Sequence, residues 1–318
     1  MLSVSGFEPI LATLKPIEAF EILKTGQNCM TDRFRLIGIG VVLLLFSLLG
    51  APEILAAHLS IAYPGEQGLA TDKRDNYYIA LLDLALTKAG VQYELKPYAH
   101  PMVRARLWKQ LEADDGVNVD WGPVTPEIER RMLPIRISLD KGLLGWRLFL
   151  INARDRPLFE HIQTLDQLKS LVAAQQTDWP DTVVLRDNGL KVIGVSDFQN
   201  LHRMLVAGRF QYFPRGVGEI WREKQVYSTL GLEVESHLAL HYTALTYFFV
   251  SKKNQTLAKV IEQGLLAAIK DGSFEKLFEQ YNGAAIRMAD LSSRTVFELH
   301  NPLMPGAASQ ELDRLPHR

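Results

Sequence analysis

Histidine, aspartate and glutamate side chains are the first candidates for chemistry in this 318-residue sequence. His237 and His241 are four residues apart, a spacing that on a helix would place both imidazole rings on one face, as in a metal-binding pair. Closed metal sites usually take three or four protein ligands, and no third ligand is evident nearby. The Asp114–Asp115 pair, and Glu127 with Glu129, occur in stretches expected to be loops. We therefore interpret all of these residues as structural or solvated, and predict neither a metal site nor an acid–base pair.

The common motifs of catalysis and nucleotide binding are missing from the sequence. It contains no G-x-G-x-x-G after a predicted strand, no P-loop, no H-E-x-x-H and no G-x-S-x-G. Charged residues make up 22% of the chain, and basic and acidic residues are interspersed with a formal net charge of -1. Because nucleic-acid binding needs clustered lysine and arginine, we expect no nucleic-acid partner. No cofactor is predicted.

A secretory signal precedes the part of the chain that is expected to fold. Arg33 and Arg35 form a short positive segment, an apolar run covers 36–49, and small residues follow at Ala56 and Ala57. This order is typical of a signal peptide, and the run is shorter than the roughly 20 residues of a membrane-spanning helix. We predict cleavage after Ala57 and a mature protein in the periplasm. An uncleaved membrane anchor is the alternative.

The sequence before this signal fits no signal peptide, and Met30 stands directly before the positive segment. We interpret residues 1–29 as a non-native upstream extension and residues 30–57 as the signal peptide. Translation would then start at Met30 and not at Met1, although the sequence is compatible with either start codon. Cys29, the only cysteine, lies in the extension. The mature chain would therefore contain no disulfide, no thiolate nucleophile and no cysteine-ligated metal.

Short apolar strands alternate with amphipathic helices along the mature chain. This order predicts an α/β fold with mostly parallel sheets flanked by helices. Glycines after the helices, such as Gly90 and Gly208, support the predicted helix ends. The expected strands cover 59–62, 91–96, 117–121, 145–152, 191–195, 210–213 and 245–250, and the expected helices cover 77–88, 103–111, 164–172, 178–185, 197–207, 217–224, 257–269 and 272–281.

Several stretches resemble one known family. Residues 247–283, YFFVSKKNQTLAKVIEQGLLAAIKDGSFEKLFEQYNG, are similar to the end of the family 3 extracellular solute-binding proteins, with "K-N-x-x-L" opening one helix and "D-G-S-F-x-K-L" opening the next. Thr125–Glu127 and Gly145–Ile151 resemble the crossover between the two lobes of that family. Trp179–Asp181 and Gly208–Gly216 resemble a subgroup of uncharacterised stand-alone members.

The resemblance, which covers about residues 58–305, implies a type 2 periplasmic-binding-protein fold with two lobes joined by two hinge strands. Lobe 1 would comprise 58–147 plus 243–300, lobe 2 would comprise 148–242, and 301–318 would form a tail. The implied function is non-catalytic binding of a small solute in the crevice between the lobes by a monomer. An ABC importer permease or a membrane sensor would be its partner. The alternative is a periplasmic, dehydratase-like enzyme on the same fold.

Two positions depart from what the resemblance implies for amino-acid binders. Ile128 stands where those proteins have an arginine that clamps the carboxylate of the substrate, and an aliphatic side chain offers no donors. The lobe 2 position that holds the amine with an acid is assigned to the neutral Gln211. We therefore expect that a free amino acid is not bound in the usual way.

Other side chains near strand and helix ends are the candidates for contacting the solute. Aromatic rings could stack on a ring or a sugar, and Arg215 could bind an anion. Tyr63 is favoured because turns after strands meet the crevice in such sheets. For the tryptophans the alternative is packing in a lobe core, and for the arginines it is ion pairing. The candidate ligand-binding residues are Tyr63, Trp121, Thr125, Trp146, Arg147, Trp179 and Arg215.

Overall fold

The computed structural model describes residues 58–65, 74–98 and 104–304. The predicted upstream extension, signal peptide and cleavage site lie outside these residues, as does most of the predicted tail. Across the described residues, no helix is both long enough and apolar enough to cross a membrane.

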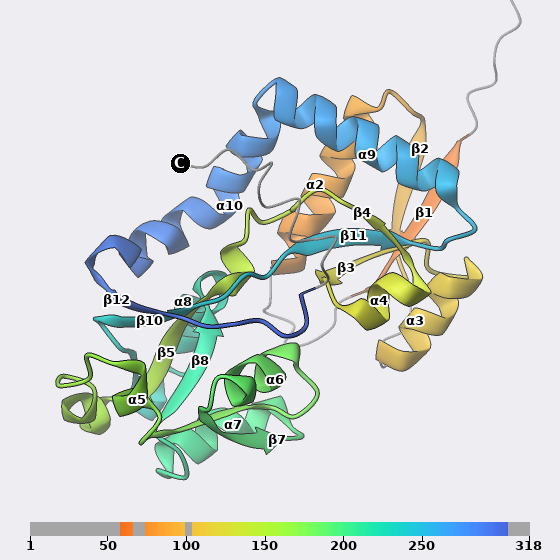
Figure 1. The fold of residues 1–318 in the computed structure, drawn as a ribbon. Helices are drawn as coiled ribbons and strands as arrows, with labels where there is room; N and C mark the ends of the chain where they lie inside the picture. Colours follow the sequence, from red (N-terminus) through yellow and green to blue (C-terminus); the bar gives the residue numbers. More distant parts are fainter. Residues whose placement is uncertain (1–57, 66–73, 99–103, 305–318) are drawn as a thin grey trace, which may run out of the picture. The chain divides into compact units, whose positions relative to one another are not determined.

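Lobe 1 is built around two small sheets (Figure 1). A parallel pair consists of β1 (Leu59–Tyr63) and β2 (Tyr93–Pro97). An antiparallel sheet has β11 (Thr246–Val250) between β3 (Val119–Pro123) and β4 (Leu133–Ile135). The helices of this lobe are α2 (Arg74–Lys88), α3 (Arg104–Ala113), α4 (Pro126–Arg131), α9 (Gln255–Lys270) and α10 (Ser273–Ala289).

The returning segment of the chain is part of the core of lobe 1. Helix α9 lies along α2, and apolar residues such as Leu82 and Leu265 share one buried cluster (Figure 1). Gly264 makes this close approach feasible, because a Cβ atom there would lie 1.8 Å from the carbonyl oxygen of Ala85. Residues 246–289 are thus packed against residues that precede them by more than a hundred positions.

The strands of lobe 2 are β5 (Trp146–Asn152), β6 (Val172–Gln176), β7 (Lys191–Val195), β8 (Tyr212–Gly216), β9 (Leu232–Val234), β10 (Leu238–His241) and β12 (Thr295–Glu298), and its helices are α5 (Leu165–Leu168), α6 (Pro180–Asp187), α7 (Phe198–Val206) and α8 (Val217–Val226). The strands form one sheet in the order β12-β10-β5-β8-β6-β7, with β9 also beside β5. Helices α7 and α8 follow strands β7 and β8, the alternation that the sequence predicts, whereas strand β6 before α6 is not predicted. Among the described residues, short 3₁₀ helices cover Leu143–Gly145, Ala153–Leu158, Ser228–Leu230 and Leu291–Ser293.

Three stretches of the described chain pass between the lobes. Two of them, from β4 to β5 and from β10 back to β11, form a pair of crossover segments, and the third leads from α10 to β12. The paired crossover segments are hydrogen-bonded to each other, from Leu139 N to Thr246 O at 2.9 Å and from Tyr242 N to Gly145 O at 3.2 Å. Gly145 allows this contact, because a Cβ atom there would lie 2.0 Å from the carbonyl oxygen of Tyr242. The two-lobed α/β fold predicted from the sequence is confirmed.

Two predicted elements of lobe 2 differ from the observed ones. Thr164 caps a helix as predicted, but that helix ends at Leu168, and the apolar residues that follow form strand β6. Periodicity alone could not separate these cases, because a short apolar run suits a buried strand as well as a helix. The strand expected at 210–213 is β8, which begins at Tyr212 and runs to Gly216. Strand β10, which includes His241, lies where no element was predicted.

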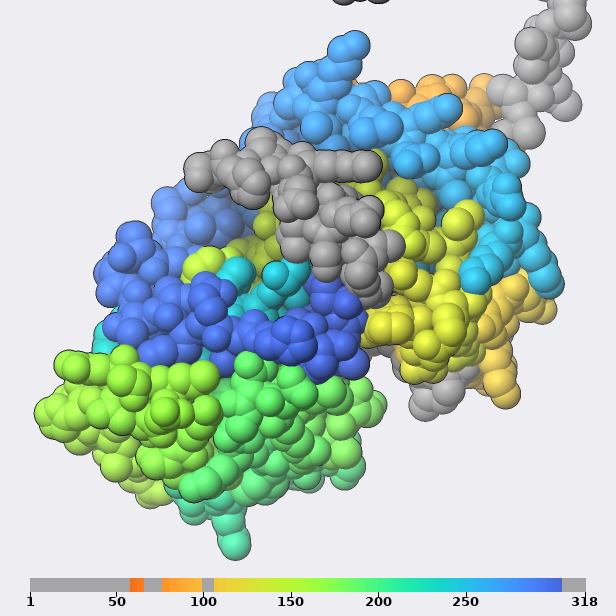
Figure 2. All heavy atoms as spheres, in the orientation of Figure 1, coloured from red at the N-terminus to blue at the C-terminus, as the bar shows by residue number. Residues whose placement is uncertain are grey.

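The last described strand corrects the predicted extent of lobe 1. Residues up to 300 were assigned to lobe 1, but β12 pairs in parallel with β10 in the sheet of lobe 2. Beyond it, the backbone of His300 exchanges two hydrogen bonds with the side chain of Asn188, at the end of α6. Figure 2 shows these dark blue residues lying against the green residues of lobe 2. Local sequence patterns do not predict this pairing, because the partner strand is more than fifty residues away.

Candidate functional site

The polar candidates in lobe 2 meet where strand β8 passes into helix α8. Arg215 is near the end of β8, and its guanidinium donates to both carboxylate oxygens of Glu223, with Nε at 2.9 and 2.8 Å and Nη2 at 2.6 Å. Nη2 also lies 2.8 Å from a carboxylate oxygen of Glu219. Helix α8 begins directly after β8, and residues four apart in a helix lie on the same face. Glu219 and Glu223 therefore both contact Arg215.

Aromatic rings enclose the guanidinium of Arg215. Its central carbon lies 4.7 Å from the ring centre of Trp179, 4.8 Å from that of Phe213 and 5.5 Å from that of Phe198. Only 3% of the Arg215 side chain is exposed. Cation–π contacts and two carboxylates therefore compensate for the loss of water around this charge.

Glu223 is the most buried acid of this group. Its side chain also lies 3.3 Å from Nε2 of His202, which is fully buried. Burial works to raise the pKa of Glu223, but the charge of Arg215 and the hydrogen bonds from His202 and Arg215 outweigh it. The pKa of Glu223 consequently lies below its usual value, and the side chain is a carboxylate at neutral pH.

Arg147 forms a second ion pair beside the first. Its Nη2 lies 2.5 Å from a carboxylate oxygen of Asp181, and its Nε donates to the hydroxyl of Tyr242 at 2.9 Å. The Tyr242 hydroxyl in turn donates to Asp181. Burial raises the pKa of Tyr242, so the hydroxyl keeps the proton that it donates. The triad joins β5, the first turn of α6 and the returning crossover.

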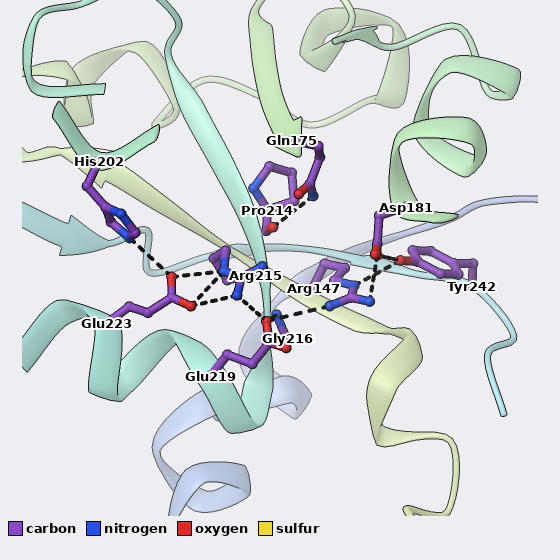
Figure 3. A network of polar contacts seen from close by, with 10 residues as sticks. All are labelled: Arg147, Gln175, Asp181, His202, Pro214, Arg215, Gly216, Glu219, Glu223 and Tyr242. Atoms are coloured by element: carbon purple, nitrogen blue, oxygen red, sulfur yellow. Dashed lines mark hydrogen bonds and ion pairs between the residues drawn. The ribbon is translucent and has the colours of Figure 1, made fainter. Parts of the chain in front are cut away.

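The two ion pairs form one network, which Figure 3 shows from His202 to Tyr242. Nη1 of Arg147 lies 4.0 Å from the carboxylate of Glu219, which also contacts Arg215. Each guanidinium in this ionic network thus has carboxylate partners within lobe 2. These contacts match the ion-pair alternative for Arg147 and Arg215, and a further contact with a solute stays a prediction.

Part of the network could have been found from the sequence. Glu219 and Glu223 are four residues apart in a predicted helix that follows Arg215 directly, which is a local signal for an ion pair. Asp181 and Tyr242 gave no such signal, because they are distant from Arg147 in the chain. Trp179, which lies near the start of the helix predicted at 178–185, is the residue before α6.

Aromatic candidates of lobe 1 form a cluster near the ends of β1 and β3. The ring centres of Tyr63 and Trp121 are 6.1 Å apart. Tyr78 of α2, which the sequence analysis did not single out, stacks on Trp121 at 5.9 Å with an angle of 27° between the rings. Tyr63 and Tyr78 are half-buried, while Trp121 is 8% exposed and also contacts the core ring of Phe248. Burial raises the pKa of Tyr63, so its hydroxyl is neutral at physiological pH.

Thr125 and Trp146 have local partners. The hydroxyl of Thr125 accepts a hydrogen bond from the backbone N–H of Ile128 at 3.3 Å and caps helix α4. The ring of Trp146, at the start of β5, lies 4.2 Å from that of His241. Ile128 itself is buried in an apolar cluster with Tyr247. No cationic side chain therefore stands at position 128.

The structure corrects the position assigned to the lobe 2 acid. Gln211 precedes β8, and its side-chain oxygen accepts a hydrogen bond from the backbone N–H of Val172 at the start of β6. It thus lies at the amino ends of these parallel strands and not at their carboxyl ends. The shift follows from β8 beginning later than predicted. Near the carboxyl end of β8 stands a cation, Arg215.

The histidine pair contacts separate groups. Nε2 of His237 lies 2.9 Å from the carbonyl oxygen of Phe159, and Nδ1 of His241 lies 2.7 Å from the carboxylate of Glu298. In the part of the chain that the structure describes, no group of three or more histidine, cysteine, aspartate or glutamate side chains is placed to hold a metal ion.

Comparison with solved structures identifies the fold. A probable amino-acid ABC transporter extracellular-binding protein of Bacillus subtilis superposes with a TM-score of 0.55 at 15% sequence identity, over 71% of this chain and 97% of that chain. This chain has the fold of the two-lobed periplasmic binding proteins. The family 3 resemblance seen in the sequence is therefore confirmed at the level of the fold.

Two further structures with this fold are similar to the chain. A Salmonella typhimurium periplasmic binding protein with high arginine specificity has a TM-score of 0.50 at 12% identity, over 71% of this chain and 99% of that chain. An ancestral arginine-binding protein bound to glutamine has a TM-score of 0.50 at 18% identity, over 71% and 98%. No family model and no curated protein sequence matches the chain.

Proposed function

We propose that this protein binds a small solute, without converting it, in the crevice between its two lobes. The observation that carries the proposal is the chain path: two lobes joined by two hydrogen-bonded crossovers, a fold shared with solute-binding proteins. Crossovers of this kind permit hinge closure, and a solute drives closure only as far as it binds the closed state better. The solute would be delivered to an ABC importer permease or reported to a membrane sensor.

Ligands in this fold bind where strand ends and helix N-termini converge. In lobe 1 these positions carry Tyr63, Trp121 and Thr125. In lobe 2 they carry Trp179, Arg215 and the Trp146–Arg147 pair near the crossover. We keep these seven residues as the proposed contact set, with the arginines acting through their ionic network.

The enzyme alternative is less well supported by the same geometry. A dehydratase needs a carboxylic acid that is protonated at its working pH and can donate to a leaving group. The acids of the network, Asp181, Glu219 and Glu223, each lie within ion-pair distance of a guanidinium. The Arg215 charge holds the pKa of Glu223 below its usual value, so this acid is a poor proton donor.

The test is to identify the solute bound to the purified periplasmic protein and to ask whether the protein converts it. Native mass spectrometry of the untreated protein should show a bound solute of defined mass. After that solute is removed and returned, the melting temperature should rise by mass action on the folded state. Incubation should leave the solute unchanged. Conversion of the solute, lost in an Asp181→Asn or Glu219→Gln variant, would establish the enzyme instead.

A further inference from the structure

Resting on the proposed function, we infer that the solute is an uncharged, ring-bearing molecule. A charged solute group loses its water when it binds in a crevice. This desolvation costs free energy that is recovered only if an opposite charge without another partner contacts the group. The described side chains proposed to contact the solute offer rings and a hydroxyl group, and the two arginines among them, Arg147 and Arg215, are already paired with carboxylates.

The two arginines proposed for the lobe 2 side of the crevice already have ionic partners. Both guanidinium groups of the ionic network are bound to carboxylates, and the Arg147 and Arg215 side chains are 5% and 3% exposed. A solute anion would have to displace Glu223 or Asp181, leaving a buried carboxylate unpaired. A solute ammonium at Asp181 would lie next to the guanidinium of Arg147, which is 2.5 Å away. Neither charge gains a partner without breaking an existing pair.

In lobe 1, helix α4 offers a solute charge no partner at Ile128 or Thr125. Ile128 is buried among apolar residues, and the Thr125 hydroxyl caps α4. Four charged side chains on and beside this helix are paired: Arg131 lies 2.5 Å from Glu112, and Arg136 lies 2.6 Å from Glu129. A solute charge that approached any of these four groups would meet a charge that already has a partner.

The aromatic cluster of Tyr63, Trp121 and Tyr78 offers a surface on which a ring could bind. Tyr63 and Tyr78 lie against Trp121 and are half-buried, so parts of their rings remain open. Aromatic faces bind the flat faces of rings, and tyrosine hydroxyls can exchange hydrogen bonds with neutral polar groups. A neutral aromatic compound or a sugar satisfies both features.

The first experiment compares four probes with one ring and different charges. These are 2-phenylethanol, phenethylamine, phenylacetate and L-phenylalanine, with D-glucose and D-galactose as neutral sugars. Calorimetry should show that a neutral probe of either kind binds at least about tenfold more tightly than each charged probe. Its affinity should change by less than about twofold between about 50 and about 500 mM salt, because no ion pair is screened.

A variant pair locates the binding. Tyr63→Leu should lower the affinity for the neutral probe by about tenfold, because the contact with the ring is lost. Tyr281→Leu, a control at an exposed tyrosine of α10, should change this affinity by less than about twofold. Equal effects of both variants would contradict the assignment to the Tyr63–Trp121–Tyr78 cluster.

The remaining outcomes separate this inference from the proposed function. Tighter binding of a charged probe, or a charged solute found on the purified protein by native mass spectrometry, overturns the neutral class but leaves solute binding intact. If no compound copurifies and no probe of any charge binds, the proposed function fails and the inference fails with it.

Discussion

The carboxylate of Asp140 accepts a 2.8 Å hydrogen bond from the hydroxyl of Thr246, and this contact ties the two crossover segments together. Asp140 lies between β4 and β5, whereas Thr246 opens the returning strand β11. The other carboxylate oxygen accepts from the backbone N–H of Gly142 at 3.2 Å. Asp140 is 4% exposed, and no ion pair to it is present among the described residues. The nearest charged neighbour in sequence, Lys141, pairs with Glu275.

This buried carboxyl group makes stability depend on pH. Burial raises the pKa of Asp140 to about 6, although hydrogen bonds from Thr246 and Gly142 work to lower it. The unfolded value is about 3.9, so between about pH 4 and pH 6 the folded state holds more protons. The contribution of Asp140 to the free energy of unfolding therefore falls as pH rises through this window, by about 3 kcal/mol in all. Asp140→Asn should remove that slope in urea titrations at several pH values. A wild-type-minus-variant difference that stays constant with pH would contradict the assignment.

Removing one acid of the ionic network should be costly. Glu223→Ala leaves the buried guanidinium of Arg215 without its bidentate partner, and we expect a loss of about 3 kcal/mol or more in the free energy of unfolding. Glu279→Ala is the matched control, because the Glu279–Arg287 pair is exposed and should contribute less than about 1 kcal/mol. Urea denaturation measures both. Similar losses in the two variants would show that burial of the Arg215 pair has little effect.

Two glycine-to-alanine substitutions should differ in their effect on the free energy of unfolding. Gly264→Ala would place a methyl group 1.8 Å from the carbonyl oxygen of Ala85 and push α9 from α2, lowering the free energy of unfolding by about 2 kcal/mol or more. Gly218→Ala, in helix α8, meets only an atom 3.9 Å away and should be neutral or stabilising by up to about 1 kcal/mol. Thermal or urea unfolding of both variants is the measurement. Equal stability of wild type and the Gly264 variant would rule out the close α2–α9 contact.

Export should remove the N-terminal segment. With cleavage after Ala57, Edman sequencing of the periplasmic protein should start at His58. A start before Leu36, together with recovery in the membrane fraction, would support the uncleaved anchor. Intact mass of the unprocessed precursor would separate a start at Met30 from a start at Met1.

The sequence by itself determined most of the alternation of strands and helices and the return of the chain to its first lobe. Helices such as α9 and strands such as β11 were predicted almost to their ends, because hydrophobic periodicity, caps and glycine stops are properties of neighbouring residues. The assignment of Ile128 to the position of a carboxylate-binding arginine, by contrast, came from the family resemblance and not from these local patterns.

Only the tertiary structure decided which charges are paired and which strands are neighbours. Asp181 and Tyr242 reach Arg147 from elsewhere in the chain, β12 joins β10, and the register of β8 puts Arg215 and not Gln211 near its carboxyl end. These arrangements depend on contacts between segments that are distant in sequence, and local propensity carries no information about a partner that only folding brings close.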